Sequence, residues 1–325
     1  MKINLATSTD DKYARYAYVM IVSALENKNT EDELHLYLLN AGLNERYLSD
    51  FKKLEEKYTG FTFTSLEVDP SRFSEKLPTE ERWSVAMYYR LMLPDILPTD
   101  VERIIYLDVD IIINKPLNEL YGLDFEGKLI CACEDYETTV VVAESMYMAK
   151  KMLDMGKKYY NSGVLLINMA KLRQKYRFDD YMKVTFELLD NLNAPDQDVI
   201  NYIHRDEIKE IDKYSYNLFA KKAFIDGMKV GDIEERSTVI HYATQKPWRG
   251  RYVHCETELL WWKYAKMTPY ADALTDEFMK ECLGDPYVYN LMTDLLVKNK
   301  KLEEEVELRK QINDKLLAIV EGNVK

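Results

Sequence analysis

The feature that most constrains the fold is a pair of aspartates inside the most apolar stretch of the chain. Residues 103–117 read RIIYLDVDIIINKPL, in which Asp108 and Asp110 stand between the apolar runs 104–107 and 111–113. A buried carboxylate is costly unless it is ion-paired, hydrogen-bonded or bound to a metal. The neighbouring residues predict a buried strand, so the fold must supply a partner for both carboxylates.

The end of a strand can supply that partner. Side chains two residues apart point the same way in a strand, about 6.7 Å apart along the chain, and a turn at its carboxyl end can bring both to one hard cation. Open α/β sheets bind ligands at that edge. An exposed acidic turn is the alternative, but the apolar neighbours disfavour it. An EF-hand is excluded because the third acid and the glycine are missing. The pattern D-x-D is weak alone, and residues 196–198 match it again.

The order of apolar patterns predicts an α/β fold. Strand-like and helix-like segments alternate through the first seventy residues, which indicates a mixed sheet with parallel crossovers. Farther on, we expect a helix over 85–93 stopped by Pro94, the aspartate-bearing strand, and two more strands in LICACED and YNSGVLLINM. The first segments are strands 1–7, 34–40 and 61–68, an amphipathic helix from Tyr13 to about residue 28, and a helix over 45–58. After the segment VIHYATQKPW the sequence predicts helices only.

The predicted organisation is one catalytic-type domain over 1–255, a helical region over 256–290 and a helical tail over 291–325. In the tail a 4–3 spacing forms a heptad seam with polar residues at some core positions. Two interpretations of this tail are open. It associates with a second copy through residues 291–320, or it is a solvated helix that packs on its own domain. The seam comprises Met292, Leu295, Asn299, Leu302, Val306, Arg309, Asn313, Leu316 and Val320.

Composition narrows the partners and the location. The 325 residues carry a net charge of −12, which disfavours nucleic acid as a partner. No run of eighteen apolar residues predicts a transmembrane segment, and the start of the chain has no apolar signal region. Cys131 and Cys133 alternate along an apparent strand and no CxxC pair occurs, so small buried thiols in a reducing cytoplasm are expected.

The glycines exclude two nucleotide-binding patterns. None of the eleven occurs as GxG, so the dinucleotide fingerprint and the P-loop are both missing. A bound diphosphate would have to be neutralised by a metal and cationic side chains. His241 and Lys246 in HYATQKPW are the candidates, although a lone histidine at a strand end is more often structural. Two carboxylates and an imidazole suit manganese, with magnesium as the alternative.

Four separated segments together resemble one enzyme family. YLDVD, YNSGVLLINM, PDQDVIN and HYATQKPW are similar, in this order, to the retaining glycosyltransferases that include bacterial lipooligosaccharide galactosyltransferases and glycogenin, known as family 8. The segment ATSTDDKYARY resembles the first nucleotide-binding loop of that family. The resemblance covers residues 1 to 250. It implies a GT-A fold with one nucleotide-sugar-binding domain, a UDP-sugar donor and a manganese ion on the diphosphate.

The resemblance also implies roles for individual residues. Asp108 and Asp110 match the metal-binding pair and His241 matches the third protein ligand. Ala6 and Tyr13 match residues that lie against the uridine, Tyr13 by stacking.

The remaining matches concern the sugar and the reaction. Arg90 matches an arginine that contacts the donor sugar, and Asn161 and Asp135 match residues that hydrogen-bond its hydroxyl groups. Asp196 and Gln197 would lie beside the anomeric carbon. Retention could arise by two displacements with Asp196 as the nucleophile, or by same-face attack with Gln197 as an electrostatic helper, and the second is favoured because an amide is a poor nucleophile.

Lys246 matches a residue that stabilises the departing diphosphate. Two departures accompany it. Ala243 and Thr244 replace a glycine that the family often has after the histidine, and the first loop is longer than expected, so Asp10 and Asp11 are both open as the residue that faces the uracil.

The sequence thus predicts a metal-dependent retaining hexosyltransferase that moves galactose or glucose from a UDP-sugar to a glycan or glycolipid such as a cell-surface polysaccharide. Transfer to a lipid acceptor would require transient visits to the inner membrane face. The alternative is a non-catalytic nucleotide-sugar-binding, glycan-binding or assembly protein built on the terminal coiled coil. Nucleotidyl transfer is disfavoured because no glycine-rich, basic cradle for a triphosphate is present.

Overall fold

The structure is a computed structural model that describes residues 1–73, 77, 84–136, 146–250, 255–284 and 287–320. The chain forms two compact units. The first comprises Met1–Pro247 and Cys255–Asp272, and the second comprises Trp248–His254 and Ala273–Lys325. The predicted boundaries at 255 and 290 stay predictions, and residues 321–325 of the predicted tail lie outside the described residues.

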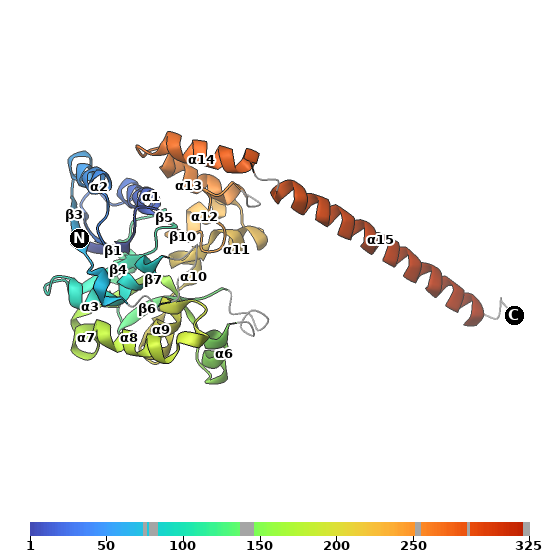
Figure 1. Cartoon of the computed structure of the whole chain (residues 1–325), viewed down its shortest axis with the longest axis horizontal. Helices are drawn as coiled ribbons and strands as arrows, with labels where there is room; N and C mark the ends of the chain where they lie inside the picture. The colour runs from blue at the N-terminus through green and yellow to red at the C-terminus, as the bar shows by residue number, and fades with distance from the viewer. Residues whose placement is uncertain (74–76, 78–83, 137–145, 251–254, 285–286, 321–325) are drawn as a thin grey trace. The chain divides into compact units, whose positions relative to one another are not determined.

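A seven-stranded sheet forms the centre of the first unit (Figure 1). Its order is β3-β2-β1-β4-β7-β6-β8, and only the pairs β4-β7 and β6-β7 are antiparallel. The expected mixed, mostly parallel sheet is therefore confirmed. The strands are β1 Lys2–Ser8, β2 Glu33–Asn40, β3 Phe61–Glu67, β4 Arg103–Leu107, β6 Ile130–Glu134, β7 Tyr160–Asn168 and β8 Ile208–Glu210.

A second, three-stranded sheet begins where β4 ends. It has the order β5-β10-β9, with β5 Ile111–Ile113, β10 Val239–His241 and β9 Leu218–Phe219. The turn between β4 and β5 carries the two aspartates, as expected for the carboxyl end of a strand. Strand β10 runs antiparallel to β5 and places His241 opposite Ile111, one residue after Asp110. This register brings the histidine to the aspartates.

Helices cover both sides of the large sheet. In Figure 1, α1 and α2 lie on one side of its strands and α7, α8 and α9 on the other. The helices of the first unit are α1 Ala14–Glu26, α2 Glu45–Lys57, η1 Pro70–Arg72, η2 Val85–Met92, α3 Leu93–Ile96, α4 Asn118–Gly122, α6 Tyr147–Asp154, α7 Met169–Lys175, α8 Phe178–Glu187, η3 Leu189–Asn191, α9 Pro195–His204, α10 Lys213–Tyr216, α11 Ala220–Ile225, α12 Val230–Arg236, η4 Glu256–Glu258 and α13 Leu259–Ala265. Helix α14 (Ala271–Gly284) leads into the second unit, which holds α15 (Tyr287–Val320). No helix of the described residues is long and apolar enough to cross a bilayer.

Two helices differ from the sequence expectation. The segment 85–93 forms the 3-10 helix η2, and Pro94 lies in the first turn of α3 instead of ending a helix. Proline fits there because its missing N–H has no partner in the first turn. Helix α1 was expected to be amphipathic, but almost all of its side chains are buried, because β5 and α13 pack against it in addition to α2.

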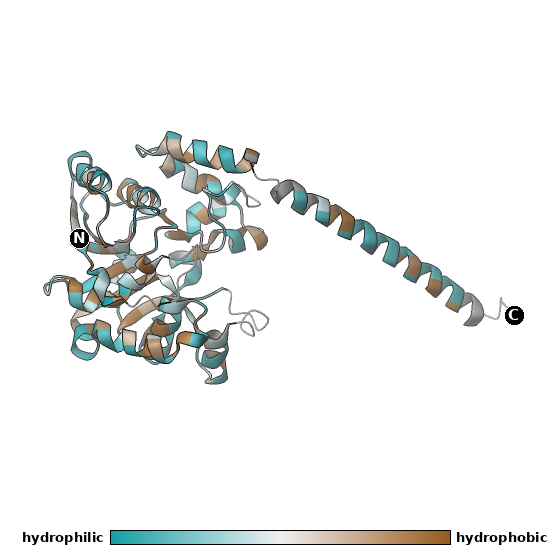
Figure 2. Cartoon of the chain, viewed as in Figure 1, coloured by the Kyte–Doolittle hydropathy of each residue, from teal (hydrophilic) through white to brown (hydrophobic). Residues whose placement is uncertain are grey.

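The core is built on the strands that flank the aspartate turn. Residues 104–107 and 111–113 are completely buried, and Figure 2 shows hydrophobic, brown residues along the central strands. Cys131 and Cys133 on β6 are buried and free, as predicted. The two aspartates are therefore held by one of the most rigidly packed parts of the chain.

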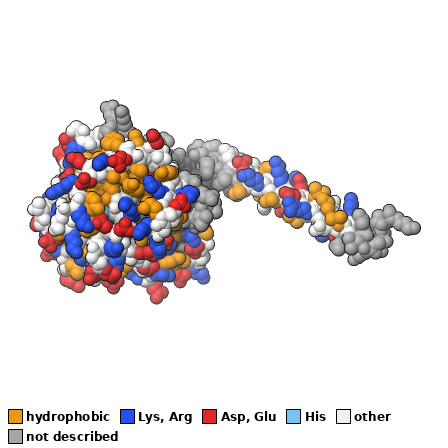
Figure 3. All heavy atoms as spheres, turned by 90° about the horizontal axis from the view of Figure 1, so that it is seen from below, with side chains coloured by type: hydrophobic (Ala, Val, Ile, Leu, Met, Phe, Trp, Pro, Cys, Tyr) orange, Lys and Arg blue, Asp and Glu red, His pale blue; other side chains and the backbone are white. Residues whose placement is uncertain are grey.

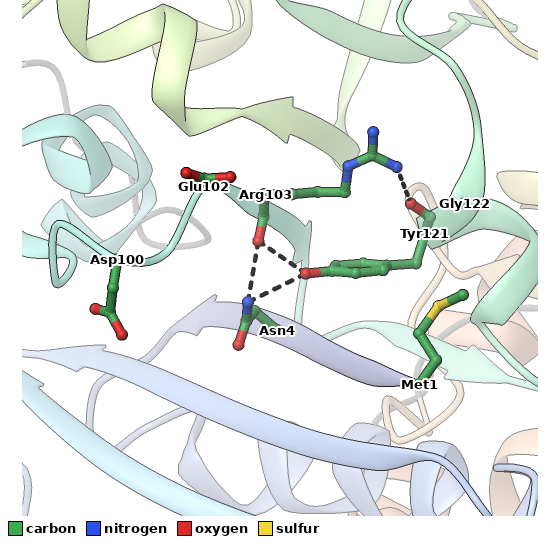
Figure 4. A pocket seen from close by; sticks show the side chains of 7 residues that line it. All are labelled: Met1, Asn4, Asp100, Glu102, Arg103, Tyr121 and Gly122. Carbon is green, nitrogen blue, oxygen red and sulfur yellow. Dashed lines mark hydrogen bonds between the residues drawn. The ribbon is translucent and has the colours of Figure 1, made fainter.

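The opposite, amino-terminal edge of β1 and β4 carries a pocket of about 380 Å³ (Figure 4). Within it, the Asn4 amide donates hydrogen bonds to the Arg103 carbonyl and the Tyr121 hydroxyl, at 3.3 and 3.1 Å. These contacts tie the start of both strands to α4. The pocket thus lies at the far end of β4 from the aspartate turn.

Candidate active site

Asp108, Asp110 and His241 form a cluster at the end of β4. Each offers one ligand atom, and the three atoms lie within 4.8 Å of one another. His241 Nε2 is 3.3 Å from Asp110 Oδ1, and the side chains of Asp110 and His241 are almost completely buried. Two carboxylate oxygens and an imidazole nitrogen are a donor set that manganese accepts. The three residues chosen from the sequence are therefore close enough to share one divalent cation.

Lys246 supplies a positive charge to the same cluster. Its ammonium group is ion-paired with Asp110 and donates to the carbonyls of Tyr242 and Ala243, at 2.9 and 3.0 Å. Burial alone would raise the pKa of Asp110, but Lys246 and His241 outweigh it and hold that pKa well below its usual range. Asp110 is thus ionised, as a metal ligand must be.

Arg90 connects the cluster to helix α9. Its buried guanidinium lies 2.7 Å from Asp108 Oδ1 and 3.1 Å from Asp196 Oδ2, and it donates to the Ser162 carbonyl at 2.8 Å. Burial would lower the pKa of Arg90, but the two carboxylates raise it. A single cation therefore offsets the charge of two acids from β4 and α9.

Amide and carboxylate groups meet beside Arg90, where β6, β7 and α9 converge. The Asn161 amide donates to Asp135 Oδ2 at 3.1 Å and to Gln197 Oε1 at 3.0 Å. The Gln197 amide donates to the same Asp135 oxygen at 3.0 Å. Ser162 donates its backbone N–H to Gln197 and its hydroxyl to Asp196, at 3.0 and 3.1 Å. The first turn of α9 is thereby fixed against the start of β7.

Asn217 links this group to the metal-type cluster, that is, to Asp108, Asp110 and His241. Asn217 was not predicted from the sequence. Its Oδ1 lies 2.8 Å from His241 Nδ1, and its amide donates to Asn161 Oδ1 at 2.8 Å. Because an amide oxygen only accepts, Nδ1 of the histidine carries a proton, and Nε2 is the nitrogen that would bind a metal. The stretch YSYNLFA around Asn217 has no pattern that would have drawn attention to it.

Gly163 is the second missed residue. A Cβ atom at this position would lie 2.5 Å from His241 Cε1 and 2.8 Å from Asp108 Oδ2. A side chain would therefore push into the cluster, which explains why the NSG segment needs a glycine. Its place in that segment was the available signal.

All of the predicted site residues except Ala6 and Tyr13 thus belong to one connected network, and these two lie on other elements. Ala6 is in β1 between Tyr37 and Tyr106, and its methyl group is completely buried. Tyr13 is half-buried at the start of α1, edge-on to Tyr16. Their contact with a uridine stays a prediction, and for Ala6 it would have to come from the backbone.

Asp10 and Asp11, either of which could face the uracil, both accept a hydrogen bond from a backbone N–H group. The N–H of Tyr13, the residue just before α1, donates to Asp10 Oδ1 at 3.0 Å. The Asn44 N–H donates to the exposed Asp11 at 2.8 Å. Asp10 is more buried than Asp11, and Asp10 is the one that bonds to Tyr13.

The second D-x-D match has a different structure from the first. Asp196 faces Arg90, whereas Asp198 accepts from the backbone N–H groups of Asn193 and Ala194 and from the Tyr159 hydroxyl, at 2.8, 2.9 and 2.6 Å. Asp198 therefore fixes the start of α9. Among the described residues, the group that could hold a metal comprises Asp108, Asp110 and His241 and does not include Asp198.

A sheet of this order, with an acid pair in the turn after a central strand, is the GT-A fold. Solved structures agree on the fold. The galactosyltransferase LgtC, in the form of an active-site mutant, matches 82% of this chain and 96% of its own with a TM-score of 0.69 at 22% identity. Its complex with donor and acceptor sugar analogs matches with a TM-score of 0.67.

The family model "Glycosyl transferase family 8" matches residues 4–251. The chain belongs to glycosyl transferase family 8. A putative glycosyltransferase of Haemophilus influenzae is 31% identical over 210 residues, which is 64% of this chain and 61% of that protein. A lipopolysaccharide 1,2-glucosyltransferase of Escherichia coli is 28% identical over 258 residues, which is 75% of this chain and 73% of that protein. The resemblance of residues 1 to 250 is thus confirmed.

Proposed function

We propose that this glycosyltransferase moves glucose or galactose from a UDP-hexose to a saccharide or glycolipid acceptor, with retention of configuration and with the help of a divalent cation. The observation that carries the proposal is the cluster of Asp108, Asp110 and His241, whose ligand atoms lie within 4.8 Å of one another beside Arg90 and Lys246. Two carboxylates brought this close together in a buried turn repel each other, and a divalent cation between them relieves the repulsion.

Asp108, Asp110 and His241 would hold the ion, with manganese favoured by the imidazole and magnesium as the alternative. The close approach of His241 and Asp108 to Gly163, where a Cβ atom would clash with both, supports this assignment. A bound ion would offset the negative charge that gathers on a departing diphosphate.

Lys246 and Arg90 have different roles in this proposal. Lys246 neutralises Asp110 in this structure. Once Asp110 binds a cation, the ammonium group can contact the phosphate and stabilise charge that grows as the sugar leaves. Arg90 holds the carboxylates of Asp108 and Asp196 in place, and its position between them suits contact with the donor sugar.

The environment of Asp196 and Gln197 supports same-face attack. Asp196 Oδ2 is held by both Arg90 and Ser162, which leaves it poorly placed to move onto an anomeric carbon. Both ends of the Gln197 amide are also fixed, by Asn161, Ser162 and Asp135. A fixed amide can stabilise positive charge on the sugar without forming a bond to it.

The names of the relatives support the substrate class. They include the lipopolysaccharide 1,2-glucosyltransferase of Escherichia coli and the lipopolysaccharide 1,3-galactosyltransferase of Salmonella typhimurium. A hexose donor and a cell-surface saccharide or glycolipid acceptor follow from that class. Such a reaction would take place in the cytoplasm, with transient visits to the inner membrane face.

The test is release of UDP from UDP-glucose and UDP-galactose with and without Mn²⁺. We expect slow hydrolysis of one donor, faster with an acceptor, and a loss of about 100-fold or more in Asp108→Asn. Asp190→Asn, an exposed carboxylate on η3, is the matched control and should keep full activity. If wild-type protein binds UDP but releases none from any donor, the non-catalytic alternative holds.

A further inference from the structure

Helix α15 exposes apolar side chains along its length. Every described side chain from Thr293 to Leu316 is exposed, including Leu302, Val306 and Leu316. Figure 2 shows hydrophobic bands recurring along this helix, and Figure 3 shows apolar, basic and acidic side chains following one another on it. Helices in proteins gain most of their stability from packing an apolar face. A 34-residue helix with this surface therefore calls for a partner.

We propose that α15 pairs with α15 of a second copy of this chain in a parallel, in-register, two-stranded coiled coil. The heptad seam sets the pairing. Its described a positions are Asn299, Val306 and Asn313, and its described d positions are Leu295, Leu302, Arg309 and Leu316. The side chains of Met292 and Val320, at the ends of the seam, lie outside the described side chains. A β-branched residue at a with leucine at d favours two strands.

The asparagines select the parallel arrangement. In a parallel, in-register pair, Asn299 and Asn313 each face the same residue of the second copy, so the two amides can hydrogen-bond to each other. In an antiparallel pair an a position faces a d position, which would bury amides against leucines without partners. The same asparagines set the register, because a shift by one heptad would place them against Val306.

The charges that flank the seam fit the same arrangement. In a parallel pair, a g residue faces the e residue five positions later in the second copy. Lys298 then faces Glu303 and Glu305 faces Lys310, two pairs of opposite charge. Within one helix, residues five apart do not face each other. The pairs Lys298–Glu303 and Glu305–Lys310 can therefore form only between copies.

Arg309 is the one charged d residue, and its charge is compensated. Its guanidinium lies 2.7 Å from Glu305 of the same helix, so it can point to the rim of the seam. It weakens the coiled coil without repelling the second copy.

The test is the mass of the full chain in solution over a range of concentrations, by sedimentation equilibrium. We expect a dimer that Leu302→Glu dissociates, because two buried leucines are lost from each dimer, with a dissociation constant raised on the order of 100-fold or more. Leu308→Glu is the matched control. Leu308 is 56% exposed and Leu302 58%, but Leu308 lies at a c position outside the seam, so its variant should remain dimeric.

A charge swap tests the orientation. Lys298→Glu should weaken the dimer, and the double variant Lys298→Glu with Glu303→Lys should restore it, because opposite charges again meet between copies. Far-ultraviolet circular dichroism would verify that each variant stays folded. A monomeric wild type, a trimer or larger assembly, a dimer unaffected by Leu302→Glu, or a double variant no better than the single one would each overturn the proposal.

Discussion

At the scale of single residues, Gly163 has little room for a side chain. A Cβ atom there would meet His241 and Asp108 at 2.5 and 2.8 Å, and neither side chain can move without leaving the cluster. We expect Gly163→Ala to lower Mn²⁺ affinity by about 10–100-fold, measured by calorimetry. Gly231→Ala is the control, because a Cβ atom on this α12 residue meets nothing within 4 Å. Equal affinities in the two variants would contradict the assigned site.

Asn217 acts on His241 without a place in the metal-type cluster itself. Asn217→Ala removes the partner of His241 Nδ1 and of Asn161 Oδ1, so Mn²⁺ affinity should fall by about 10–100-fold. Asn217→Asp keeps an acceptor for Nδ1 and should recover part of the loss. The order of the three Mn²⁺ affinities is the readout, and an aspartate variant as weak as the alanine variant would count against a positioning role.

The sequence was informative about those residues whose chemistry conflicts with their surroundings. Asp108 and Asp110 were evident because carboxylates are out of place in an apolar run. Lys246 was a candidate because a diphosphate needs a cation, and Arg90, Asn161 and Gln197 came from the family resemblance. The structure places Arg90 and Lys246 beside the two aspartates, and Asn161 and Gln197 beside Asp135. Asn217 could not be found, because its role depends on the packing of β9 against β10, which no local pattern records.

At the scale of elements, the packing of α8 on α9 predicts a pH dependence of stability. His204 is completely buried on α9, where its Nε2 lies 2.8 Å from the Tyr181 hydroxyl of α8. Burial lowers the pKa of His204 to about 4, although Glu207 opposes the shift. The unfolded chain therefore binds more protons than the folded one between pH 6.5 and about 4, and stability falls as the pH falls through that range.

Replacing this histidine should flatten that slope. Between pH 6.5 and 4, the free energy of unfolding of the wild type should fall by about 2–3 kcal/mol more than that of His204→Gln, measured by urea denaturation. Asp198 contributes in the opposite direction, since burial raises its pKa to about 6, so the difference between wild type and variant is the quantity to compare. Parallel pH curves would contradict the assignment.

The sequence predicted an element well where burial of one of its faces determined it. The alternating segment 61–68 became the half-exposed strand β3 because only one of its faces meets the core. Prediction failed where tertiary packing or chain geometry intervened. Helix α1 is buried on most sides by neighbours that come from distant parts of the chain, and the short strands β8 and β9 are defined by their pairing with β6 and β10. Two or three residues carry too little periodicity to reveal such strands.

At the scale of the whole molecule, the proposed function joins a cation site at the end of β4 to a nucleotide-sugar donor. The cation should strengthen binding of the diphosphate, because their charges are opposite. The diphosphate should strengthen binding of the cation equally, because the coupling between two ligands is reciprocal. In the proposed site this coupling would need Asp108, Asp110 and His241 together, and all three belong to the first unit. It is therefore a property that no isolated segment of the chain can show.

The most direct test is calorimetric titration of UDP into the wild-type chain, once with Mn²⁺ and once with a chelator. We predict that Mn²⁺ tightens UDP binding on the order of 100-fold in the wild type and has little effect in Asp110→Asn. UDP affinity that is the same with Mn²⁺ and with chelator, in a wild-type protein shown to be folded, would contradict the account.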